Sequence, residues 1–260
     1  MKKGLKVIST AAVLALGMSA LAGCGGSTDS SGSDELVMGT NAAFVPFEFV
    51  TSNGLVGEFD GVDVVIASKV AEKTGQTLKI EDMEFDGLIA ALSSGKVDFV
   101  AAGMSITPER AQSVDFSDTY YTATQVMLVS NTNTDITKAE DLKNDKSVGV
   151  VLGYTGDTVV TETLQLPEDK IVRANRAVDI AQDVVNGKLD AVVMDKTTGE
   201  ALAAKTGLKV VEDPEVFEQE EYAIAVKKGN TKLLEAINSV LSEMKANNEI
   251  EPLVEKYSQQ

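Results

Sequence analysis

Three polar residues stand out for the chemistry that their types and positions allow: Arg110, Thr155 and Asp195. The guanidinium of an arginine such as Arg110 can grip both oxygens of a carboxylate, although an arginine near a helix start is also commonly just solvated. Thr155 stands where a glycine-flanked loop enters a helix, so its hydroxyl can bind an anion or simply cap the helix. Asp195 follows a buried strand and can hold an ammonium group or cap the next helix. These residues favour a site for a small molecule that carries both charges.

Alternating helices and strands are expected to position these side chains. The apolar spacing predicts helices over Val62–Thr74 and Lys232–Ala246. Asp86 is expected to cap a further helix, and Thr137 and Glu140 have the spacing of a capping box. Strands between such helices indicate an α/β fold with mostly parallel sheets.

One nine-residue pattern occurs twice, as GKVDFVAAG over Gly95–Gly103 and as GKLDAVVMD over Gly187–Asp195. Each copy predicts a helix end, a glycine stop and a buried strand, although such turns are common in α/β proteins. The repeat favours two similar α/β lobes. Because ligands bind beyond the carboxyl ends of parallel strands, Met104 and its neighbours in one lobe and Asp195 in the other are expected to face one cleft.

The N-terminal segment has the layout of a signal peptide, with a positive start and a short apolar run. It ends in Leu-Ala-Gly-Cys, which resembles the bacterial lipobox, and Cys24 is the only cysteine of the chain. We therefore expect residues 1–23 to be a lipoprotein signal peptide, Cys24 to be lipidated, and residues 24–33 to form a flexible tether. An uncleaved membrane anchor is the alternative. In either case the rest of the chain lies outside the cytoplasm.

Composition excludes several classes of function. The chain has 40 acidic and 23 basic residues and a net charge of −17, which argues against binding to nucleic acid. It has no histidine and a single cysteine, so histidine-based catalysis, histidine or cysteine-cluster metal sites and an intrachain disulfide are excluded. No metal or other cofactor is expected.

Five separate motifs, in order, resemble the extracellular solute-binding proteins of family 3, which are the amino-acid receptors of ABC importers. The motifs are Asn41–Phe49, Gly103–Arg110, Asp115–Asp118, Val148–Gly156 and Leu189–Asp195. The resemblance implies a two-lobed clamshell of the periplasmic-binding-protein type, in which each lobe is a mostly parallel sheet flanked by helices. Two hinge crossings are implied near residues 122–127 and 218–223. Lobe 1 would comprise residues 34–123 and 217–260, and lobe 2 residues 124–216.

The resemblance also implies roles at the ligand site. Arg110 and Thr155 would bind the carboxylate of a free amino acid, and Asp195, with Gly103 and Ser105, its ammonium group. Phe44 and Phe85 align with aromatic residues that sandwich the ligand side chain. The complete set of expected ligand-binding residues is Asn41, Phe44, Phe85, Gly103, Met104, Ser105, Arg110, Thr155 and Asp195.

The side-chain end of the ligand is expected to meet Asn41. Receptors for basic amino acids in this family often carry an acid there, whereas an amide suits an uncharged polar group. Glutamine is the first candidate, because the residues that follow Asn41 look most like glutamine receptors. Some glutamine receptors place a lysine where this chain has Val151, so aliphatic and sulfur-containing side chains are alternatives.

The resemblance therefore predicts a lipid-anchored, monomeric receptor that hands a free L-amino acid to the permease and ATPase of an ABC importer. A dehydratase-like enzyme is one alternative, because Glu48, Glu84, Asp86 and Asp195 could supply acid and base. A ligand-sensing subunit of a signalling system is the other.

Overall fold

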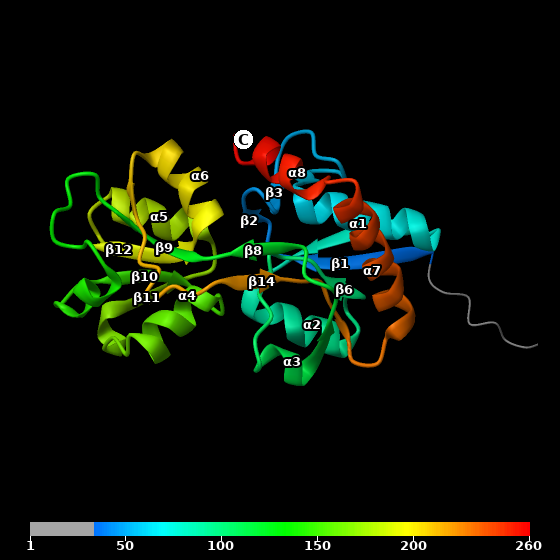
Figure 1. The fold of residues 1–260 in the computed structure, drawn as a ribbon, viewed down its shortest axis with the longest axis horizontal. Coiled ribbons are helices and arrows are strands. Elements are labelled where there is room, and N and C mark those ends of the chain that lie inside the picture. Colours follow the sequence, from blue (N-terminus) through cyan, green and yellow to red (C-terminus); the bar gives the residue numbers. More distant parts are fainter. Residues whose placement is uncertain (1–33) are drawn as a thin grey trace, which may run out of the picture. The chain divides into compact units, whose positions relative to one another are not determined.

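The computed structural model describes residues 34–260. The expected signal peptide, the lipidation residue Cys24 and the whole of the expected tether lie outside the described residues. Two five-stranded sheets form the centres of two lobes, and a pair of extended strands runs between them (Figure 1). None of the helices within residues 34–260 is long and apolar enough to cross a membrane.

The first sheet has the strand order β5-β1-β6-β15-β7. Its strands are β1 (Glu35–Thr40), β5 (Thr77–Asp82), β6 (Phe99–Val100), β7 (Val114–Phe116) and β15 (Ala225–Lys227). Two helices cover its opposite faces, α1 (Val62–Thr74) and α2 (Leu88–Ser94), and a short helix, α3 (Arg110–Ser113), precedes β7 (Figure 1). A small antiparallel sheet of β2 (Ala43–Phe44), β3 (Glu48–Val50) and β4 (Phe59–Asp60) lies beside it.

The second sheet has the order β11-β10-β12-β9-β13. Its strands are β9 (Gln125–Val129), β10 (Val148–Val151), β11 (Ile171–Ala174), β12 (Ala191–Asp195) and β13 (Lys209–Val211). Helices α5 (Ala177–Val185) and α6 (Lys196–Thr206) cover one face, and α4 (Thr155–Thr158) lies on the other (Figure 1).

Both sheets are mixed. In each, the strands that are linked through helices pair in parallel, as predicted: β1 with β5 and β6, and β10 with β11 and β12. The antiparallel pairings come from β15 and β9, which each enter their sheet directly after the chain has crossed from the other lobe. A strand that arrives from the opposite side runs against its neighbours, which the local sequence pattern does not reveal.

The two crossings are β8 (Tyr121–Ala123) and β14 (Glu220–Tyr222), which pair antiparallel. They connect the two sheets in the middle of the molecule (Figure 1). Each crossing strand is only three residues long, so few hydrogen bonds resist a change in the angle between the lobes.

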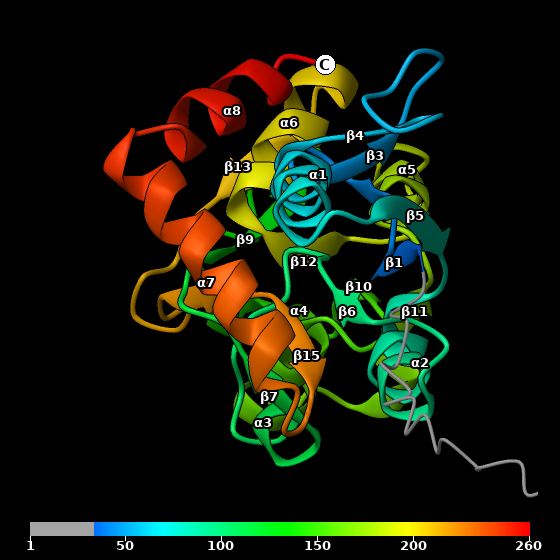
Figure 2. The same ribbon diagram turned by 90° about the vertical axis from the view of Figure 1, so that its right-hand side faces the viewer.

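The C-terminal helices return to the first lobe. Helix α7 (Thr231–Ala246) packs along α1, and α8 (Ile250–Tyr257) follows it (Figure 2). Lys73 Nζ lies 2.7 Å from Glu243 Oε1 across the α1–α7 contact. Because this pair is exposed to solvent, the buried side chains of Ile237 and Leu241 contribute more to the packing.

Local predictions made from sequence have mixed outcomes. The helix over Val62–Thr74 is confirmed, and the repeated pattern ends in the central strand of each sheet, β6 and β12. Asp86 lies inside a 3₁₀ turn over Phe85–Gly87 and makes no capping bond, so the prediction that it caps a helix is wrong.

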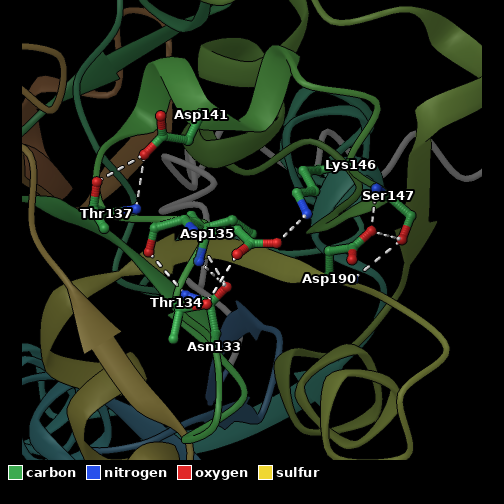
Figure 3. Close-up of polar contacts among 9 residues, drawn as sticks. Asn133, Thr134, Asp135, Thr137, Asp141, Lys146, Ser147 and Asp190 are labelled. Atoms are coloured by element: carbon green, nitrogen blue, oxygen red, sulfur yellow. Dashed lines mark hydrogen bonds and ion pairs between the residues drawn. The ribbon is translucent and has the colours of Figure 1, made fainter.

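The capping box expected at Glu140 is also wrong. Asp141 accepts hydrogen bonds from Thr137 N (2.8 Å), Thr137 Oγ1 (2.9 Å) and Lys138 N (3.1 Å), and a 3₁₀ turn over Ala139–Lys143 begins there (Figure 3). The N-cap residue of this turn is Lys138, one residue later than expected, so the acid at the third position of the turn is Asp141.

Candidate functional site

A small cavity of about 10 Å³ lies between the lobes. Its lining residues come from both lobes: Phe44, Phe85, Ala102, Gly103, Ser105, Arg110, Tyr154, Thr155 and Asp195. Seven of the nine predicted ligand-binding residues line it, and Asn41 and Met104 do not. A space of this size holds about one water molecule, so an amino acid can enter only if the lobes separate or lining side chains move.

A larger cleft of about 1090 Å³ adjoins this cavity and shares Phe85, Arg110 and Thr155 with it. Met104, which is almost fully buried, lines the larger cleft. Its carbonyl oxygen accepts a hydrogen bond from Ala223 N (3.0 Å), just after the crossing strand β14. Met104 thus connects the loop after β6 to the hinge.

Arg110 begins α3 and its guanidinium reaches both lobes. Nη1 donates to the carbonyl of Ser105 (2.7 Å) in the first lobe, and Nη2 donates to the carbonyl of Gly153 (2.9 Å) in the second. Its Cζ lies 5.1 Å from the centre of the Phe85 ring. Burial lowers the pKa of Arg110, and the charge of Glu220 opposes that shift. Because a guanidinium has more N–H groups than these two bonds use, Arg110 can still bind a carboxylate.

Asp195 ends β12 and is the residue before α6, yet its side chain does not cap that helix. The carboxylate instead accepts a hydrogen bond from Tyr222 Oη and lines the cavity, with 4% of the residue exposed. Burial, and then the charge of Glu220, raise the pKa of Asp195 to about 7. The geometry therefore favours the binding of a cation over the capping role that the sequence left open.

The raised pKa of Asp195 predicts that amino-acid binding depends on pH. A bound ammonium would stabilise the charged carboxylate of Asp195 and so lower its pKa from about 7. Below about pH 7 the carboxyl group is mostly protonated, so the ligand would have to displace a proton in order to bind. The Kd should be steady above the raised value and rise about tenfold from about pH 8 to about pH 6. Isothermal titration calorimetry at a series of pH values measures this. An unchanged Kd over that range would contradict the assignment.

Gly103, in the loop after β6, has a left-handed backbone conformation that favours glycine, with φ +51°. A Cβ built there would lie 2.4 Å from a ring carbon of Phe44. Gly103 N donates to Asp63 Oδ2 (2.8 Å), and Tyr120 Oη donates to the other oxygen of that carboxylate (2.7 Å). Burial raises the pKa of Asp63 to about 6, and Gly103 N–H and Tyr120 partly offset that shift. The buried carboxylate fixes the backbone at the cavity wall.

Three aromatic residues line the cavity: Phe44, Phe85 and Tyr154. Tyr154 packs edge-on against Phe44 and Phe85, with ring centres 5.4 Å and 4.6 Å apart. Tyr154 Oη donates to Asn41 Oδ1 (3.0 Å), and Asn41 Nδ2 donates to the carbonyl of Met83 (2.8 Å). Asn41 itself does not line the cavity and is joined to it through Tyr154.

Sequence reasoning missed three residues at this site: Tyr154, Glu220 and Gln125. Glu220 Oε2 accepts hydrogen bonds from Ser105 Oγ (2.5 Å) and Thr155 Oγ1 (2.7 Å). Gln125 Nε2 donates to Thr155 Oγ1 (3.1 Å) and Glu220 Oε1 (3.2 Å). Glu220 stands in an acidic run that looks like ordinary surface, so only the hinge topology reveals it. No cluster of histidine, cysteine and acidic side chains within residues 34–260 could hold a metal ion.

Comparisons with known proteins agree with this architecture. A family profile described as bacterial extracellular solute-binding proteins, family 3, matches residues 36–260. The arginine-binding extracellular protein ArtP of Bacillus subtilis is 36% identical, over 99% of this chain and 98% of its own length.

Solved structures of amino-acid-binding proteins also resemble this chain. An ancestral arginine-binding protein bound to glutamine superposes with a TM-score of 0.78 at 39% identity, covering 87% of this chain and 99% of that one. The ancestral amino acid-binding protein AncCDT-1, a precursor of cyclohexadienyl dehydratase, has a TM-score of 0.77 at 36% identity, covering 86% of this chain and 95% of that one. Matching sequence over nearly the whole described chain, and a matching two-lobed fold, place this chain in the bacterial extracellular solute-binding proteins of family 3.

Proposed function

We propose that this protein is an extracytoplasmic receptor that binds a free L-amino acid and delivers it, as a monomer, to the permease and ATPase of an ABC importer. One observation carries the proposal: Arg110 and Asp195, with opposite charges and from different lobes, line the same cavity. A free amino acid carries a carboxylate and an ammonium on one carbon. Burying either charge without a partner costs several kcal/mol, so a site with one fixed charge for each suits this class of ligand.

The ligand that we propose has an uncharged polar side chain, and glutamine is the first candidate. The amide of Asn41 and the hydroxyl of Tyr154 offer donors and acceptors without a charge at the side-chain end. The ancestral arginine-binding protein was solved with glutamine bound, so this fold can hold glutamine. The relative ArtP is named for arginine, which makes arginine the main competitor.

A thermal-shift screen of the standard amino acids tests this function. Glutamine or another uncharged polar amino acid should raise the melting temperature most, because a ligand that binds only the folded state stabilises it by mass action. A largest shift with arginine or lysine would refute the proposed ligand class. No shift with any amino acid would refute the receptor function itself.

We further propose that Cys24 anchors the protein to the cell membrane through lipid. The lipobox-like ending and the position of the only cysteine support this. Cys24→Ser is expected to release the protein from the membrane fraction, because two acyl chains on one residue hold a protein stably and no helix in residues 34–260 can span a membrane. Cell fractionation and metabolic labelling with a clickable fatty acid measure the change. A Cys24→Ser protein that stays in the membrane fraction would show that another segment or a partner is the anchor.

Binding, and not catalysis, is the role that we propose. ArtP is named as a binding protein, and the chain has no histidine to act as a general base. The enzyme is the second candidate, because AncCDT-1 is named as a precursor of a dehydratase. AncCDT-1 is itself named as an amino acid-binding protein, which favours binding. Permease and ATPase genes beside this one would favour transport over a sensing role.

A further inference from the structure

The crossing strand β14 places one carboxylate, that of Glu220, between the lobes. Glu220 Oε2 accepts hydrogen bonds from Ser105 Oγ of the first lobe (2.5 Å) and from Thr155 Oγ1 of the second (2.7 Å). The other oxygen accepts from Gln125 Nε2 (3.2 Å), at the start of β9. A single anion on the hinge thus joins both walls of the candidate site.

This carboxylate uses groups that a ligand carboxylate also needs. A hydroxyl has one proton, so while Thr155 donates to Glu220 it cannot donate to a ligand. The negative charge of Glu220 also acts on Arg110, where it is the largest influence that opposes the lowering of the pKa by burial. An anion beside Arg110 reduces the attraction of that guanidinium for a second anion.

We propose that Glu220 is an internal competitor of the ligand carboxylate. Glu220 bridges Ser105 and Thr155, and it must give up Thr155 when an amino acid binds near Arg110. This proposal rests on the proposed function and deepens it, because it names a residue that sets affinity. The Ser105 hydroxyl donates its proton to Glu220, but its oxygen keeps free lone pairs. Ser105 Oγ can therefore accept a hydrogen bond from a ligand ammonium while the bridge to Glu220 is intact.

The first test compares Glu220→Gln with Glu221→Gln, a matched control whose side chain is exposed on the same strand. Calorimetry should show Glu220→Gln binding the best amino acid of the thermal-shift screen about tenfold more tightly than the wild type, because a neutral amide no longer competes with its carboxylate. The α-carboxamide analogue of that amino acid should gain nothing, since it has no carboxylate. Glu221→Gln should match the wild type. An unchanged or weaker affinity of Glu220→Gln for the amino acid, or an equal gain for the carboxamide, would overturn the proposal.

The second test needs no ligand, so it examines the bridging role even if the thermal-shift screen finds no amino acid that binds. Glu220→Ala removes the bridge between Ser105 and Thr155. Small-angle scattering without added amino acid should therefore give this variant a larger radius of gyration than the wild type and the control Glu221→Ala. An unchanged radius would overturn the bridging role. An absence of binding by the wild type to all amino acids would instead refute the receptor function and leave this comparison intact.

Discussion

Asp195→Ala is expected to weaken amino-acid binding by about 2–5 kcal/mol, or roughly thirtyfold to several thousandfold in Kd. The variant removes the anionic partner of the ligand ammonium from the cavity. Because Asp195 is only 4% exposed, water cannot easily replace the lost carboxylate. Calorimetry with the best amino acid of the thermal-shift screen measures the loss.

Asp195→Asn is the matched control for packing, because it keeps the shape and can still accept from Tyr222 Oη. It should lose affinity nearly as much as Asp195→Ala, since the charge is what the ammonium needs. Binding by Asp195→Ala within about threefold of the wild type would mean that Asp195 does not contact the ligand.

Arg110→Ala is expected to cause a loss of similar size from the carboxylate end. It removes the guanidinium that reaches Ser105 and Gly153, and with it both the charge for the ligand carboxylate and one contact between the lobes. The Kd should rise roughly thirtyfold or more, which the same calorimetry measures.

Arg176→Ala separates these two contributions. Arg176 also joins the lobes, through Nη2 to the carbonyl of Ala42 (3.2 Å), but it does not line the cavity. It should therefore leave the Kd close to that of the wild type. A loss of the same size in both variants would show that interlobe contact, and not carboxylate binding, explains the effect of Arg110→Ala.

Features that depend on neighbouring residues in the sequence were predictable. The helix over Val62–Thr74 follows from its apolar spacing and from Gly75, whose φ of +72° ends it. The repeated pattern correctly placed a central strand in each lobe, because a helix end, a glycine and an apolar run specify that turn locally.

Features that depend on residues distant in the sequence were not predictable. Glu220 becomes part of the site only because β14 pairs with β8 at the crossing, nearly one hundred residues away along the chain. Tyr154 looked like a residue of a glycine-flanked loop, and its contacts with Phe44 and Phe85 arise only when the lobes meet. Asn41 was expected at the site from its sequence context, but its hydrogen bond from Tyr154 Oη joins residues 113 positions apart, and no local pattern encodes it.

The most direct test of the central claim is a calorimetric comparison of one amino acid with its two singly charged analogues. Glutamine is titrated first, or the best amino acid of the thermal-shift screen, followed by its decarboxylated amine and its deaminated acid. Because Arg110 and Asp195 line one cavity, we predict one-site binding of the amino acid and binding of each analogue that is weaker by about a hundredfold or more. Equal binding of the deaminated acid and the amino acid, or no binding of any amino acid, would contradict the account.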